Sequence, residues 1–179
     1  MKKALVLVMV LVLAAAMIAG CSGGASGGSA DDVKGEMYDA GSISALVPEG
    51  WMAFPTSDMF DEYEGDNDPT SFSIYKGAES EWDSFVKPGV QISYYAPDAG
   101  FMSAKDWYDD VQDIEAFDLG NFSWTGYTGS SLEVPVTVLE GTSDAGTVQL
   151  IIMTEMDDGK IALEDADVQA IIKSVAITA

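Results

Sequence analysis

Histidine and arginine are absent from this 179-residue chain, and cysteine occurs only once. Without histidine, Ser-His-Asp and Cys-His catalysis and the usual zinc sites are excluded. Without arginine, the chain lacks the bidentate clamps that hold phosphates and carboxylates. A single cysteine cannot form a disulfide within the chain. The common catalytic constellations are therefore excluded, and we predict no catalytic residue and no bound cofactor.

Positive charge is scarce. Eight lysines stand against 30 acidic residues, which gives a formal net charge of −22. Nucleic acid is excluded as a partner because neutralising its phosphates requires a basic surface. An anionic membrane surface would also repel this chain. The same acidity favours a soluble, monomeric domain.

The N-terminus has the three parts of an export signal. Lys2 and Lys3 precede an apolar run of about 16 residues, Ala4 to Ala19, which ends in small residues. This pattern is typical of a signal peptide. A membrane span needs roughly 18 or more apolar residues, so an uncleaved transmembrane anchor is the second interpretation. A plain secretory signal that leaves a free cysteine is the third.

The only cysteine lies at the end of this signal. The sequence Ile18-Ala19-Gly20-Cys21 resembles the lipobox of bacterial lipoproteins. The resemblance implies cleavage between Gly20 and Cys21 and a diacylglycerol joined to the Cys21 thiol. It places the protein on the extracytoplasmic face of the cell membrane, held by its acyl chains. The mature chain carries six lysines and all 30 acids, a formal charge of −24.

Composition divides the chain into three parts. Residues 1–20 form the lipoprotein signal peptide. Residues 21–39 hold the lipidated cysteine and a Gly/Ser-rich tether, because small residues without packing side chains give a flexible linker. Residues 40–179 are long enough to bury one core, and we interpret them as a single domain.

Alternating apolar and polar residues predict seven strands. Pro48-Glu49-Gly50 predicts a turn that joins the first two strands in a hairpin. Pro135 cannot donate to a ladder, so its strand is expected at an edge or at a bulge. The predicted strands cover residues 42–47, 51–54, 71–75, 90–95, 121–125, 132–138 and 147–152.

Helices are predicted in three places. A short helix over 79–86 would place Trp82 and Phe85 inward. A middle helix beginning at Ser103 would align three apolar residues on one face by their spacing. Those three residues are Trp107, Val111 and Ile114.

A closing helix over 165–177 has Asp165 at its N-cap. Connections between most strands are too short for parallel crossovers. We therefore predict the α+β class, an antiparallel twisted sheet of about six to seven strands with two main packed helices.

The order of elements resembles the Mog1/PsbP-like fold. The resemblance is carried by the strand that runs from Ile43 into Trp51, the predicted helix around Trp107, and the closing stretch from Asp165 to Val175. Members of this family include bacterial lipoproteins and serve as binding scaffolds with no shared active site. The resemblance transfers no functional residue to this chain.

Acidic residues concentrate in the segment 56–70. Their oxygens could bind calcium, although their spacing does not match the calcium loop of helix-loop-helix proteins. The alternative is a solvated acidic loop without metal. The candidate ligands are Asp61, Glu62, Glu64, Asp66 and Asp68.

Two aromatic residues are candidates for a ligand groove. Trp82 lies on a connection, and Tyr95 lies on the opposite strand face from Tyr94. The alternative is that both pack in the core, as large aromatic residues usually do.

These observations lead to one main hypothesis, a membrane-anchored, non-catalytic binding module of the cell envelope with an envelope protein or other extracytoplasmic partner. An alternative is a ligand or calcium receptor that uses the 56–70 segment. A third is a carboxylate-based hydrolase, which would need two acids facing each other across a pocket.

Overall fold

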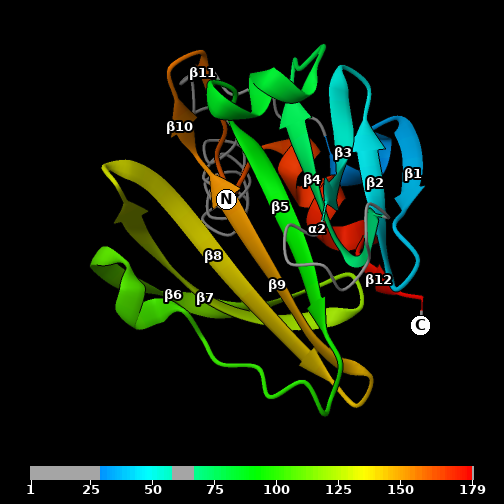
Figure 1. Cartoon of the computed structure of the whole chain (residues 1–179), viewed down its shortest axis with the longest axis vertical. Helices are drawn as coiled ribbons and strands as arrows, with labels where there is room; N and C mark the ends of the chain where they lie inside the picture. The colour runs from blue at the N-terminus through cyan, green and yellow to red at the C-terminus, as the bar shows by residue number, and fades with distance from the viewer. Residues whose placement is uncertain (1–28, 58–66, 179) are drawn as a thin grey trace, which may run out of the picture.

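The computed structural model describes residues 29–57 and 67–178. Its largest element is a seven-stranded sheet in which every neighbouring pair is antiparallel (Figure 1). The strand order is β3 (Trp51–Ser57), β4 (Asn67–Lys76), β5 (Gly89–Tyr95), β9 (Gly146–Met153), β8 (Val134–Ser143), β7 (Phe122–Ser131) and β6 (Asp109–Leu119).

A second, three-stranded sheet joins both ends of the domain. Its middle strand β2 (Ile43–Pro48) pairs with β1 (Gly35–Asp39) on one side and with β12 (Ala176–Ile177) on the other. A separate hairpin, β10 (Glu155–Met156) with β11 (Gly159–Lys160), follows β9. β1 lies within the range that the sequence analysis assigned to the tether.

α2 (Ala166–Ser174) is the one α-helix among residues 29–57 and 67–178. Its buried stripe, Val168, Ile171 and Ile172, packs into the main core with β2 and the seven-stranded sheet. Asp165 occupies the N-cap as predicted, but its carboxylate accepts a hydrogen bond from the Ala162 N–H (3.0 Å) and none from the helix. The described residues are thus predominantly antiparallel sheet with one α-helix, and the prediction of two main packed helices is wrong.

Short 3-10 turns complete the described elements. They are η1 (Ala30–Asp32), η2 (Glu81–Phe85) and η3 (Lys105–Trp107). Within the described residues, no helix is long and apolar enough to cross a membrane.

The predicted middle helix is wrong, because β6 takes its place. Two register shifts interrupt the pairing of β6 with β7, one between Asp109 and Gln112 and one between Ile114 and Phe117. A bulge adds a residue to the alternation, so the half-buried side chains fall three apart, at Val111, Ile114 and Phe117. Apolar residues three positions apart also share one face of a helix, so this spacing resembles the pattern of an amphipathic helix. Trp107, predicted on that face, is instead 86% exposed.

Two predictions about strand neighbours are also wrong. β8 is an interior strand, paired with both β7 and β9. Pro135 is tolerated there because it is the second residue of β8, while pairing with β9 begins at Val136. The first hairpin is formed by β1 and β2, whereas β3 leaves β2 to enter the large sheet.

η1 packs beside α2, and the chain then passes the start of β3, where the Lys34 carbonyl accepts a hydrogen bond from the Glu49 N–H (2.9 Å). Asp31 in η1 forms an ion pair with Lys173 at the end of α2. Gly120, in the β6–β7 turn, lies against the Lys173 carbonyl, where an added Cβ would be 2.1 Å from the oxygen. From this turn β7 runs ten residues to the β7–β8 turn. At about 3.3 Å per residue, the two ends of the sheet are roughly 30 Å apart.

Candidate functional site

The predicted metal ligands fall mostly outside the described residues, as do Gly20 and Cys21. Asp61, Glu62, Glu64 and Asp66 are among those not described. Asp68 is described, and its Oδ1 accepts hydrogen bonds from both the backbone N–H and the hydroxyl of Thr70 (2.7 Å each). Asp68 therefore stabilises the start of β4. Residues 29–57 and 67–178 contain no group of three or more acids or cysteines placed to hold a metal ion.

Trp82 and Tyr95 do not form one groove. Trp82 precedes β5, and Tyr95 is the last residue of that seven-residue strand, so roughly 20 Å of strand separates them. Tyr95 is half-buried against Phe101, with ring centroids 4.9 Å apart. This burial raises the pKa of Tyr95 above its usual value. Trp82 points outward and is 79% exposed, contrary to the inward placement predicted with the 79–86 helix.

Topology brings several exposed apolar residues to the sheet end at which β5 begins. β5, β8 and β6 begin at this end, and β9 and β7 finish there. The β7–β8 turn and the β10–β11 hairpin mark it at the upper left of Figure 1. We call Trp82, Phe85, Trp107 and Leu132 the apolar end; Phe85 is 70% and Leu132 93% exposed. Because these residues come from three separate connections, sequence spacing could not reveal that they share an end.

η2 holds two of these aromatic side chains in a fixed arrangement. Asp83 Oδ2 accepts hydrogen bonds from the backbone N–H groups of Glu79 (2.8 Å) and Ser80 (2.9 Å). These bonds lower the pKa of Asp83 and keep its carboxylate ionised. Residues three apart in a 3-10 turn lie on one side, so Trp82 and Phe85 stack with centroids 6.2 Å apart. The exposed pair is therefore preformed.

A groove of about 720 Å³ lies between Phe85 and Leu132. One wall is the start of β8, and the other is the β10 region. Thr154 secures the β10 side, because its N–H and its hydroxyl both donate to the Pro135 carbonyl at 3.1 Å. The remaining lining residues include the carboxylates Glu133, Glu155 and Asp157 together with Val134, Pro135 and Met156.

Two contacts fix the β10–β11 turn to η2. The Asp158 N–H donates to the Val86 carbonyl (2.9 Å), and the Lys87 ammonium forms an ion pair with the Asp158 carboxylate (2.5 Å). η2, the β10–β11 hairpin and the start of β8 thus form one connected rim around the groove.

The β7–β8 turn presents Leu132 at the cost of backbone strain. Leu132 and Glu133 both have positive φ, 51° and 70°. A two-residue hairpin turn with this geometry favours Asn-Gly. Each non-glycine residue in the left-handed region costs about 1–2 kcal/mol. Leucine and glutamate occupy positions where Asn-Gly would be favoured, and the leucine is exposed. Backbone strain of this kind concentrates at functional sites.

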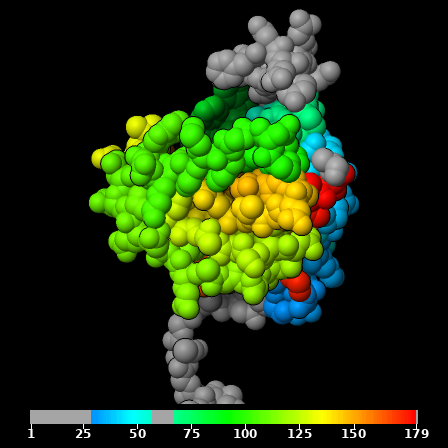
Figure 2. All heavy atoms as spheres, turned by 90° about the horizontal axis from the view of Figure 1, so that it is seen from below, coloured from blue at the N-terminus to red at the C-terminus, as the bar shows by residue number. Residues whose placement is uncertain are grey.

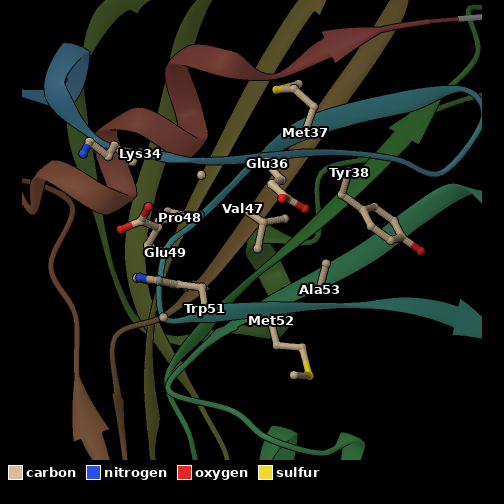
Figure 3. A pocket seen from close by; sticks show the side chains of 12 residues that line it. Lys34, Glu36, Met37, Tyr38, Val47, Pro48, Glu49, Trp51, Met52 and Ala53 are labelled. Atoms are coloured by element: carbon tan, nitrogen blue, oxygen red, sulfur yellow. The ribbon is translucent and has the colours of Figure 1, made fainter.

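A second hollow, of about 530 Å³, lies between β1 and β3 (Figure 3). Its aromatic residues make contacts within the domain. Trp51 Nε1 donates to the Asp167 carboxylate (3.1 Å), and the Tyr38 ring packs on Phe72 with centroids 4.8 Å apart. Lys34, Glu36 and Glu49 on its walls give it mixed charge. It offers a less distinctive binding chemistry than the groove at the apolar end.

The β5–β6 connection covers a smaller apolar cluster that contains Tyr127. In Figure 2 this connection (green) crosses beside the β8–β9 turn (yellow-orange). Ser103 in the connection donates to Glu140 (2.6 Å). The Tyr127 hydroxyl is buried and has no hydrogen-bond partner among the described residues. Burial raises the pKa of Tyr127 to about 12.

Comparisons with known proteins leave the family open. No family model matches this chain, and no curated protein sequence matches it. A solved structure from Bacteroides thetaiotaomicron VPI-5482 is similar, with 10% identity and a TM-score of 0.46. The match covers 81% of this chain and 49% of that one, so this chain spans about half its length. A likeness at this level says nothing about function.

Proposed function

We propose that this protein is a membrane-anchored extracytoplasmic lipoprotein whose domain is a non-catalytic binding module for another protein of the cell envelope. One observation carries the binding role. Phe85 and Leu132, exposed at 70% and 93%, border a groove at one end of the sheet, and Trp82, exposed at 79%, stacks on Phe85. Large apolar residues gathered on a soluble surface mark interaction sites, and tryptophan is enriched among the residues that dominate binding energy.

A Mog1/PsbP-like scaffold belongs to the same proposal. In its favour, the strand that runs from Ile43 towards Trp51 and the closing helix Ala166–Ser174 occur in the expected order. The helix expected around Trp107 is replaced by η3 and β6. The proposal of this scaffold therefore depends on the first and last elements of the domain.

Mass spectrometry and phase partitioning test the anchor. Full-length protein expressed in a bacterial host is expected to enter the detergent phase and to begin at a diacylglycerol-bearing Cys21. C21S is the matched control, since it changes one atom and removes the acceptor. A cleaved wild-type chain with an unmodified cysteine would contradict the anchor.

Cross-linking in intact envelopes tests the binding role. Wild-type protein is expected to form a defined cross-linked product with an envelope protein, and W82A/F85A is expected to lose it. M37A/M52A, which removes two exposed apolar side chains from the other hollow, should retain the product. Loss of the product in both variants, or in neither, would contradict binding at the apolar end.

A further inference from the structure

We propose that the groove between Phe85 and Leu132 receives a lysine or arginine side chain, supplied by a partner segment in which basic and apolar residues lie side by side. This inference rests on the proposed function and names the class of partner. Its basis is the pairing of two properties in one groove, apolar edges and an acidic lining.

The apolar edges would contact the apolar part of such a segment. Phe85 stands on η2 beside Trp82, and Leu132 stands opposite on the β7–β8 turn. η2 is held by hydrogen bonds within the domain and the β7–β8 turn closes a paired hairpin, so binding would order little backbone. Preformed surfaces of this kind lose less entropy on binding.

The lining would contact the basic side chain. Glu133 and Asp157 line the groove and have no lysine partner among the described residues, whereas Glu155, which also lines it, is paired with Lys160. Within the described residues, both lysines of this region are already in ion pairs, Lys87 with Asp158 (2.5 Å) and Lys160 with Glu155 (2.6 Å). The carboxylates of the surrounding elements, η2, the β7–β8 turn and the β10–β11 hairpin, are Glu79, Glu81, Asp83, Glu133, Glu155, Asp157 and Asp158.

The acidic charge of the groove disfavours two other occupants, a second copy of the chain and an anionic lipid surface. A second copy of the chain would bring two acidic rims together, and opposed like charges disfavour association. An anionic lipid surface would likewise be repelled. A basic, apolar segment satisfies both the aromatic edges and the carboxylates.

Peptide titration of the full-length protein in detergent micelles tests the proposal. The probes are fluorescein-labelled ten-residue peptides that alternate leucine with lysine, leucine with glutamate, or serine with lysine. The leucine-lysine peptide is expected to bind most tightly in 0.15 M NaCl and to weaken as salt rises. Equal binding of the leucine-glutamate or serine-lysine peptide would overturn the proposal.

Matched variants separate the groove from the general acidity of the chain. W82A/F85A and E133Q/D157N are each expected to raise the Kd at least tenfold. The control E36Q/D144N removes the same charge from exposed sites elsewhere and should change the Kd less than threefold. Thermal melting confirms that each variant folds. Equal losses in E133Q/D157N and E36Q/D144N would show diffuse attraction and overturn the proposal.

Two further measurements address the other occupants. Sedimentation that shows a dimer lost in W82A/F85A would assign the surface to a second copy. Quenching of Trp82 by brominated phosphatidylglycerol, identified by comparison with W82F, would assign it to the membrane. Either result would overturn the proposal. Equal binding of the three peptides would also overturn it, even if the cross-link to an envelope protein still formed. An unmodified Cys21 would remove the anchor and leave the peptide result standing.

Discussion

Replacing Leu132-Glu133 by Asn-Gly is expected to stabilise the fold while weakening binding at the apolar end. Both residues have positive φ; glycine would relieve about 1–2 kcal/mol of strain at the second position, and asparagine, which tolerates this region better than leucine, about 0.5–1 kcal/mol at the first. The greater freedom of glycine in the unfolded chain returns about 0.5–1 kcal/mol. Leu132 is 93% exposed, so little packing is lost with its side chain. The net expectation is a gain of about 1–2 kcal/mol.

Urea and thermal unfolding measure this gain, which corresponds to a rise in Tm of about 3–6 °C for a domain of this size. L132A is the control, because alanine removes the leucine side chain and leaves the strained backbone. It should weaken binding of the leucine-lysine peptide and leave the free energy of unfolding within about 0.5 kcal/mol of wild type. If L132N/E133G melts at or below the wild-type temperature, the assignment of strain to this turn is wrong.

Three other substitutions test the core contacts. Tyr127 stays protonated in the folded state up to about pH 12, whereas the phenol of the unfolded chain ionises near pH 10. The free energy of unfolding therefore falls as the pH rises between these two values. In urea titrations, Y127F should flatten this fall and raise the free energy of unfolding at pH 7 by about 1 kcal/mol. W51F removes the Nε1 hydrogen bond to Asp167 and should cost about 1–2 kcal/mol in urea unfolding, with no loss counting against the bond. G120A places a Cβ against the Lys173 carbonyl at positive φ, and calorimetry should show a loss of about 2–4 kcal/mol; a wild-type melting curve would refute that contact.

Much of the strand content followed from alternation, because regular pairing places every second residue on one face. β4, β5, β7 and β9 occur where alternation predicted strands, and their inward residues are buried. Trp124, within the strand predicted over 121–125, is fully buried. The closing helix is confirmed over Ala166–Ser174, where three apolar residues at helical spacing are buried, but the last residues of the predicted range, Ala176 and Ile177, form β12 instead.

The errors have identifiable physical causes. β6 was read as a helix because its bulges space the half-buried Val111, Ile114 and Phe117 three apart. β1 gave no signal, since this edge strand is largely exposed and lacks alternation. The groove could not be predicted because its edges, Phe85 and Leu132, approach each other only through the order of strands in the sheet.

Both ends of the domain meet on β2, which has consequences for the timing of folding. β12 pairs with β2 through Ala176 and Ile177, and the Thr178 N–H donates to the Ser42 carbonyl (2.9 Å). The smaller sheet therefore remains incomplete until Ala176 and Ile177 have left the ribosome. In a chain exported unfolded, as the proposed lipoprotein would be, β1 and β2 can pair first, and the sheet is completed only after β12 has followed them across the membrane.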